Sequence, residues 1–377
     1  MNTQNLIYIH VPFCASRCIY CDFYSTVMDE QTKAQYVATV CQELVERTSY
    51  LPNREIRTIY FGGGTPSQLS IAQIAQILQC IQSTYKVDNN AEITLEANPD
   101  DITPDFATQL VGLGINRVSL GVQSFDDGIL KLLNRRHSAQ QAQTAVKRLN
   151  AADIHNVSID LIYGLPQQSP QSFSADLETA FSLPIKHLSS YALSIEANTP
   201  LAQKVQAGKL VVADEEMCVK EYEMLMEQAM QHGFMHYEIS NFALPGYESK
   251  HNSGYWDGTP YLGVGPGAHS YDGKNRRYNT PNLKAYVASK GCPTHQTEQL
   301  SLSEQFDELI FISLRTSKGL SLKKVQDLYP QQWYNDLMRT AQKYIATNQL
   351  ILQNKTLRIS KQSIMVSDDI MSDLMRG

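Results

Sequence analysis

The chain has 377 residues, of which 42% are hydrophobic and 19% are charged, and its formal net charge is -6 at pH 7. This balance lacks the basic excess of a general nucleic-acid binder, so we expect no nucleic-acid partner. The odd number of cysteines, seven, favours a reducing compartment. The first residues match neither a signal peptide nor a membrane span, so we expect a cytoplasmic protein without a transmembrane segment.

The first 200 residues alternate predicted strands with predicted helices. Apolar and β-branched runs predict strands at residues 6–11, 56–61, 91–97, 116–123, 157–163 and 187–194. Helical periodicity predicts helices at 31–48, 71–85, 104–113, 126–133, 138–152 and 170–181. Because parallel crossovers are right-handed, six βα units predict an α/β fold, a partial (βα)6 barrel of TIM type, closed or nearly closed. Residues 1–200 would form this core, with its site at the carboxyl ends of the strands.

Two further regions are predicted after residue 200. We expect residues 201–300 to complete the barrel, because a helix at 214–232 is followed by a segment rich in glycine and aromatic residues. Within residues 301–377, helical periodicity predicts helices at 304–315, 322–329 and 331–347. A hairpin that turns at Asn354 and Lys355 is predicted after them. Together these elements predict a mostly α, winged-helix-like module. It is not notably basic, so we expect it to contact protein or act as a lid rather than to bind DNA.

Three cysteines, Cys14, Cys18 and Cys21, lie within eight residues directly after the first predicted strand. Thiolates this close cannot all pair as disulfides without strain, so the spacing favours a metal site. A structural zinc ion needs a fourth ligand, and no second Cys or His pair follows at a suitable spacing, although His10 is a conceivable fourth ligand. An iron–sulfur cluster held by three thiolates instead leaves one iron open to a small molecule.

Chemically unusual residues also follow the other predicted strands, as expected for the mouth of a barrel. The second strand ends in GGGTP at residues 62–66, the third reaches Glu96 and the fourth ends at Gln123. Asp160 lies inside an otherwise apolar strand, where a carboxylate is costly to bury without partners.

Four motifs carry a family resemblance: the cysteine loop, GGGTP, GVQSF at residues 121–125 and DLIYGLP at residues 160–166. Together they resemble the branch of the radical S-adenosylmethionine (SAM) superfamily that contains the oxygen-independent coproporphyrinogen III oxidases, or dehydrogenases. HNSGYW at residues 251–256 and YLGVGPGAHS at residues 261–270 look like the haem chaperones of this branch. The resemblance covers nearly the whole chain.

The resemblance implies roles for individual residues. Cys14, Cys18 and Cys21 would ligate a [4Fe–4S] cluster, whose open iron binds SAM. His251 is the candidate haem ligand, beside the flat rings of Tyr255 and Trp256. Glycine backbone allows close approach, and its free amides can receive the SAM carboxylate. The residues that would flank the cluster or contact SAM are Tyr8, Phe23, Gly63, Gly64, Thr65, Glu96, Gln123, Arg135, Asp160 and Ala192.

Each of these assignments has a structural alternative. The three glycines would also make a tight turn between strand and helix. Arg135 could pair with a surface carboxylate, and Glu96 and Asp160 could form a structural network across the barrel. His251 could be a hydrogen-bonded loop histidine beside packed aromatic rings.

Two functions of different class follow from the resemblance. One is a haem chaperone that binds a cluster, SAM and haem, and delivers haem to recipient haemoproteins. The other is a coproporphyrinogen III dehydrogenase, and a radical SAM enzyme with another substrate is a third alternative. The dehydrogenases carry a further cysteine where this chain has Phe23, and an extension ahead of the cluster loop, so both features favour the chaperone. A homodimer and a peripheral membrane association are compatible with this hypothesis, and we assign no catalytic residue.

Overall fold

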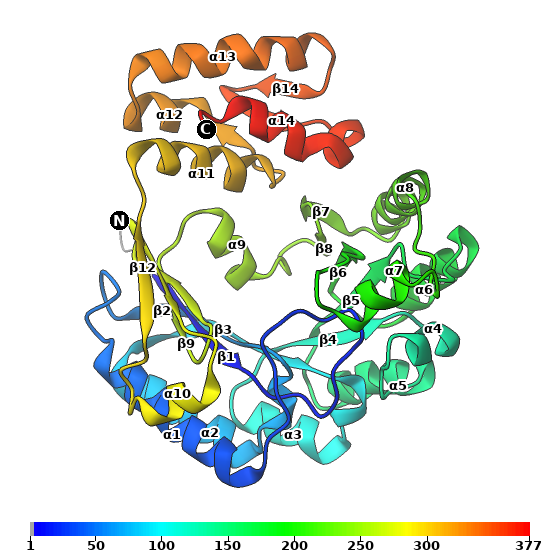
Figure 1. Ribbon diagram of the computed structural model, residues 1–377, viewed down its shortest axis with the longest axis vertical. Helices are drawn as coiled ribbons and strands as arrows, with labels where there is room; N and C mark the ends of the chain where they lie inside the picture. The colour runs from blue at the N-terminus through cyan, green and yellow to red at the C-terminus, as the bar shows by residue number, and fades with distance from the viewer. Residues whose placement is uncertain (1–3) are drawn as a thin grey trace.

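A curved, mostly parallel sheet organises the protein, shown in Figure 1 as a computed structural model that describes residues 4–377. Its first six strands are parallel neighbours in the order in which they occur along the chain. They are β1 (Asn5–Val11), β2 (Glu55–Gly63), β3 (Lys86–Ala97), β4 (Arg117–Gln123), β5 (Asn156–Tyr163) and β6 (His187–Ala192). The six predicted strands are therefore confirmed. Strand β3 begins earlier than expected, because its polar first residues pair with β2 without forming an apolar run.

Helices cover the outer face of this sheet (Figure 1). Several begin at a side-chain cap, and Ser70 and Ser138 form capping boxes that satisfy otherwise unpaired backbone amides. The helices of this layer are α1 (Glu30–Glu46), α2 (Ile71–Thr84), α3 (Pro104–Gly112), α4 (Asp127–Leu132), α5 (Ala139–Ala151) and α6 (Pro170–Ser182). Helices α7 (Pro200–Gln206) and α8 (Glu215–Gln231) follow.

The sheet continues beyond β1 and β6 and stays open within residues 4–377. At one edge β9 (Tyr261–Val264) runs parallel to β1, followed by the antiparallel β10 (His269–Tyr271), β11 (Asn275–Asn279) and β12 (His295–Gln299). At the other edge β8 (Asn241–Ala243) pairs antiparallel with β6, and β7 (Met235–Glu238) follows. A partial barrel is confirmed, but it does not close, because the chain after β6 returns through antiparallel strands rather than further βα units.

Helices α9 (Lys250–Trp256) and α10 (Leu283–Ala288) connect the edge strands. The last part of the chain forms a mostly helical module with its own apolar core, which includes Phe306 and Leu337. It contains α11 (Leu302–Leu314), β13 (Leu320–Ser321), α12 (Leu322–Leu328), α13 (Gln331–Ala346), β14 (Leu350–Gln353), β15 (Thr356–Ile359) and α14 (Ser367–Leu374). The β14–β15 hairpin turns at Asn354 and Lys355, both with positive φ, as predicted. None of the helices within residues 4–377 is both long and apolar enough to cross a membrane.

Candidate functional site

A cavity of about 490 Å³ lies at the carboxyl ends of the parallel strands, beside the cysteine loop. It brings together most of the residues selected from the sequence, which come from loops far apart along the chain. These residues are Cys14, Cys18, Cys21, Phe23, Gly63, Gly64, Thr65, Glu96, Gln123, Arg135, Asp160 and Ala192. Tyr8 and His251 do not line this cavity.

Backbone hydrogen bonds hold the cysteine loop over the strand ends. The amide of Cys14 donates to the carbonyl of Thr26 over 3.0 Å, and the amide of Ile19 donates to Leu133 at the end of α4 over 3.3 Å. All three cysteines are free thiols, and burial raises the pKa of Cys21. The first bond thus joins the start and end of the loop, and the second attaches its middle to the end of α4.

Gly64 packs directly under this loop. A Cβ atom at Gly64 would lie 2.8 Å from the carbonyl oxygen of Phe13 and 3.1 Å from Cys14 Sγ. The amides of Gly63 and Gly64 already donate to Glu96 Oε2 over 3.2 Å and to the Val11 carbonyl over 2.8 Å. Our expectation that these two amides are free for a carboxylate is therefore wrong, because the turn uses them. The glycines matter here for close approach.

The donor set fits an iron–sulfur cluster. Three thiols line the cavity, and thiolates are the usual cluster ligands. Only glycine fits at position 64 beside them, because a Cβ atom there would clash with the cysteine loop. The alternative with His10 as a zinc ligand fits poorly, because its ring nitrogens lie 3.2 Å from Tyr8 Oη and 3.3 Å from the Tyr24 carbonyl. Across residues 4–377, no three His, Cys, Asp or Glu side chains are arranged to hold a single metal ion.

Two partly buried carboxylates also line the cavity. Glu96 accepts a hydrogen bond from Tyr60 Oη over 2.7 Å, and burial raises the pKa of Glu96 to about 7. Asp160 accepts a hydrogen bond from Ser119 Oγ over 3.3 Å, and burial also raises the pKa of Asp160. The guanidinium of Arg117, only 2% exposed, favours the charged form of both. The carboxylates therefore belong to a network and line the cavity at the same time.

Arg135 points into the cavity rather than to a surface carboxylate. Its Nη1 donates to Cys18 Sγ over 3.3 Å, and its Nη2 donates to Asn98 Oδ1 over 2.8 Å. The neighbouring Arg136 makes the pairs that the structural alternative assigned to Arg135, with Asp100 and Asp101, each over 2.8 Å. Arg135 thus places a positive charge beside one of the candidate cluster ligands.

Comparison with known proteins identifies the family. Residues 8–180 match the radical SAM superfamily. The haem chaperone HemW of Bacillus subtilis is 36% identical over 85% of this chain and 86% of that protein. HemW of Escherichia coli is 37% identical over 70% of this chain and 69% of that protein. Mitochondrial radical S-adenosyl methionine domain-containing protein 1 of Bos taurus is 32% identical over 98% of this chain and 87% of that protein. This chain belongs to the HemW family.

A solved structure supports the fold of this HemW-family chain. Coproporphyrinogen III oxidase (HemN) from Escherichia coli superposes with a TM-score of 0.85 over 99% of this chain and 90% of that one, at 22% identity. Radical SAM membership implies a [4Fe–4S] cluster and SAM as cofactors, and the residues around the cavity fit both.

The remaining two predicted residues lie together, away from the cysteines. His251 is 1% exposed, and its Nδ1 and Nε2 lie 2.6 Å from Thr58 Oγ1 and 2.8 Å from Tyr255 Oη. Burial lowers the pKa of His251 to about 3. The ring of Tyr8 lies 6.3 Å from the ring of His251. Both ring nitrogens thus have partners, and iron ligation by His251 stays a prediction that requires one of these hydrogen bonds to break.

Several cavity residues escaped sequence reasoning in this HemW-family chain. Tyr20, Asn98 and Tyr191 line the cavity beside the predicted residues. Asn98 comes directly after the strand that contains Glu96, so its position at a strand end could have predicted that it lines the cavity. Arg117 was a further signal, because a cation within an apolar strand needs a buried partner. Tyr191 gave no signal, since a tyrosine within a predicted strand is ordinary for that element.

Proposed function

We propose that this protein is a haem carrier, which holds a [4Fe–4S] cluster and SAM, binds haem and delivers it to recipient haemoproteins. The similarity to haem chaperones over most of the chain carries this proposal. Free cysteines throughout the described residues support the cytoplasmic location expected from the sequence.

Phe23 supports the carrier over the dehydrogenase. Its side chain is 63% exposed and lines the cluster cavity where the dehydrogenases have a further cysteine. A phenyl ring offers no thiolate, no proton and no hydrogen bond. The site therefore lacks a reactive group at the position where the enzymes of this branch have one.

The cavity residues would divide the work of holding the cofactors. Cys14, Cys18 and Cys21 would hold the cluster through thiolates, and the bound cluster would supply a redox-active iron with an open position for SAM. Gly64 has no side chain, so it leaves room for the cysteine loop beside it. In their ionised forms Glu96 and Asp160 would complement a sulfonium cation, and their oxygens can accept hydrogen bonds from ribose hydroxyls.

We propose that the chain is organised as residues 1–200, 201–300 and 301–377. The first part contains the cysteine loop and the six parallel strands, and the second contains the edge strands and α9. The third has an apolar core of its own. This organisation would place the second part between the cofactors and the module formed by the third.

One anaerobic preparation, with its iron and sulfide content measured, tests the proposal. Added haem should give a stable complex with a shifted Soret band, and transfer to a recipient apohaemoprotein should follow. Coproporphyrinogen III, SAM and reductant should give no protoporphyrinogen IX. Turnover without haem binding would establish the dehydrogenase instead, which so far is supported by fold alone.

A further inference from the structure

A second cavity, outside the cofactor site, lies between the sheet edge and the C-terminal module. It has a volume of about 1140 Å³ and is lined by residues of β9–β11, α9, α11 and α12. Cavities of about 300 to 1000 Å³ accept drug-sized ligands, so this space is ample for a macrocycle. Phe23 is the one residue that lines both this cavity and the cluster cavity among the described residues. The two spaces are therefore adjacent but distinct.

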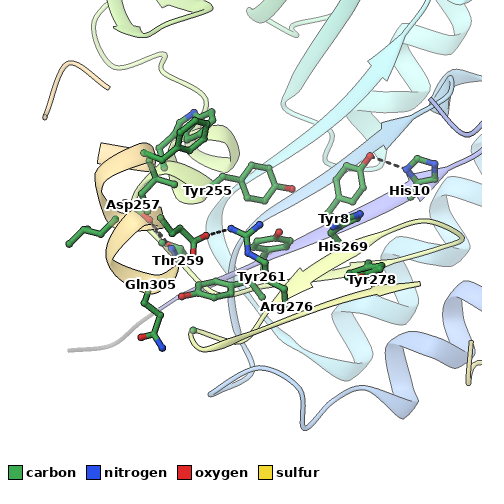
Figure 2. A pocket seen from close by; sticks show the side chains of 18 of the residues that line it. Tyr8, His10, Tyr255, Asp257, Thr259, Tyr261, His269, Arg276, Tyr278 and Gln305 are labelled. Carbon is green, nitrogen blue, oxygen red and sulfur yellow. Dashed lines mark hydrogen bonds and ion pairs between the residues drawn. The ribbon is translucent and has the colours of Figure 1, made fainter. Parts of the chain in front are cut away.

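Aromatic side chains dominate the walls of this cavity (Figure 2). Flat rings offer apolar surface against which a planar ligand can stack. The rings come from the sheet edge, from α9 and from the C-terminal module, and include Tyr255, Trp256, Tyr261, Tyr271, Tyr278 and Tyr329.

His269 offers an accessible imidazole on this wall. It lies at the start of β10, is exposed, and stacks on Tyr278 with ring centroids 5.2 Å apart and 20° between planes. Neither of its ring nitrogens has a hydrogen-bond partner in the part of the chain that the structure describes. Partial burial and the nearby Arg276 lower the pKa of His269, which favours the neutral form that binds metals.

Two other histidines are less suited to bind a ligand in this cavity. His10 lines it too, but is 7% exposed, and both of its ring nitrogens have partners. His251 does not line it and instead faces a smaller cavity of about 220 Å³. His269 is thus the histidine of this cavity that can ligate a metal without losing a hydrogen bond.

Charged groups from two sides of the cavity complement a ligand with carboxylates. Arg276 on β11 forms an ion pair with Glu308 on α11, and Lys324 on α12 is exposed. Asp257 also lines the cavity, and Arg57 pairs with it over 3.4 Å. The acidic groups therefore have cationic partners, and the Lys324 amine has no ion-pair partner within residues 4–377.

We propose that this cavity binds haem, an iron porphyrin with carboxylate side chains, with His269 as an axial iron ligand and with Arg276 and Lys324 beside the propionates. The inference rests on the proposed haem-carrier function. A haem bound in this way would contact the sheet edge and the C-terminal module at once, which gives this module a role in holding the cargo.

Haem titration of the full-length protein tests this inference. We expect His269→Ala to shift the Soret maximum and the electron paramagnetic resonance spectrum of ferric haem, and to weaken binding by roughly tenfold. Lys324→Glu should weaken binding a few-fold without moving the Soret maximum, because it changes a propionate contact and not the iron ligand. The same titration of His251→Ala compares the two candidate iron ligands directly. His295→Ala, an exposed histidine of β12 outside the cavity, is the matched control.

The outcomes separate this inference from the function on which it rests. If wild type binds haem but His269→Ala has the wild-type spectrum and affinity, His269 is not the ligand and the inference is overturned. A spectrum lost in His251→Ala and kept in His269→Ala would restore the first assignment. If wild type binds no haem, the proposed function itself fails.

Discussion

Arg135 Nη1 donates a hydrogen bond to Cys18 Sγ over 3.3 Å, which places a guanidinium beside a candidate cluster ligand. Positive charge and hydrogen bonds at cluster sulfurs raise the reduction potential, because they stabilise the more negative reduced state. Arg135→Gln should therefore bind the cluster but shift its potential downward, on the order of 60 mV for a tenfold change in a one-electron equilibrium. An anaerobic redox titration followed by electron paramagnetic resonance measures this shift. Arg136→Gln is the control, because Arg136 pairs with Asp100 and Asp101, and equal potentials in both variants would contradict the argument.

Cys18→Ser should lose iron and sulfide after anaerobic reconstitution, because an alcohol is a poor cluster ligand at neutral pH. Cys292→Ser should retain both, since Cys292 is exposed and does not line the cluster cavity. The measurement is the iron and sulfide content per chain. Full iron content in Cys18→Ser would remove Cys18 from the ligand set.

Gly64→Ala should lower iron incorporation. The added methyl group would lie 2.8 Å from the Phe13 carbonyl and 3.1 Å from Cys14 Sγ, so the cysteine loop must move. Gly112→Ala at the end of α3 is the matched control, because its methyl group would meet no atom within 4 Å. We expect this control to reconstitute like wild type. Normal iron content in Gly64→Ala would show that the loop adapts without cost to the site.

Glu43→Gln should lower the free energy of unfolding by about 3 to 5 kcal/mol, since it leaves a buried cation without its partner. Arg47 Nη1 donates to Glu43 Oε1 over 2.9 Å, and both side chains are nearly fully buried. Tyr286 Oη and the amide of Gly265 donate to Glu43 Oε2 over 2.7 and 3.0 Å. Urea unfolding measures the change. Glu46→Gln on the exposed side of the same helix should change it by less than about 0.5 kcal/mol.

Stability should depend on pH through His137. Burial, and then repulsion from Arg135, lower the pKa of native His137 to about 4 from its ordinary 6.5. Between these values the unfolded chain binds a proton that the native state does not bind. This contribution to the free energy of unfolding therefore falls as pH falls from 6.5 to 4, by up to about 1.4 kcal/mol per pH unit. The difference between wild type and His137→Gln, measured by urea unfolding across this range, should show that slope. A difference that is constant with pH would contradict the assignment.

The parallel strands and the cluster loop were predictable from sequence for a physical reason. Buried parallel strands are continuous apolar runs, and the carboxyl ends of such strands meet at one edge, so Cys14, Glu96 and Asp160 could be brought together before any coordinates were known. The strands at the sheet edges were not predicted. Strand β12 is fully exposed and β11 half-buried, so neither has a period-two apolar pattern.

The environment of His251 was also not readable from the chain. Its motif suggests an aromatic surface, but the hydrogen bond between His251 and Thr58 depends on α9 packing against β2. The hydrogen bond between His251 and Tyr255 lies within α9 itself. His269 carried no sequence signal beyond its place in a glycine-rich run. Its exposure follows from the position of β10 near the sheet edge, which is a property of the topology.

Phe23 forms part of the wall of both large cavities. Occupancy of either space changes the surroundings of that single ring, and thermodynamic linkage makes any such influence mutual. If bound SAM changes the affinity for haem by some factor, bound haem must change the affinity for SAM by the same factor. Under the proposed function, any coupling through Phe23 would make the affinity for SAM depend on whether haem is bound.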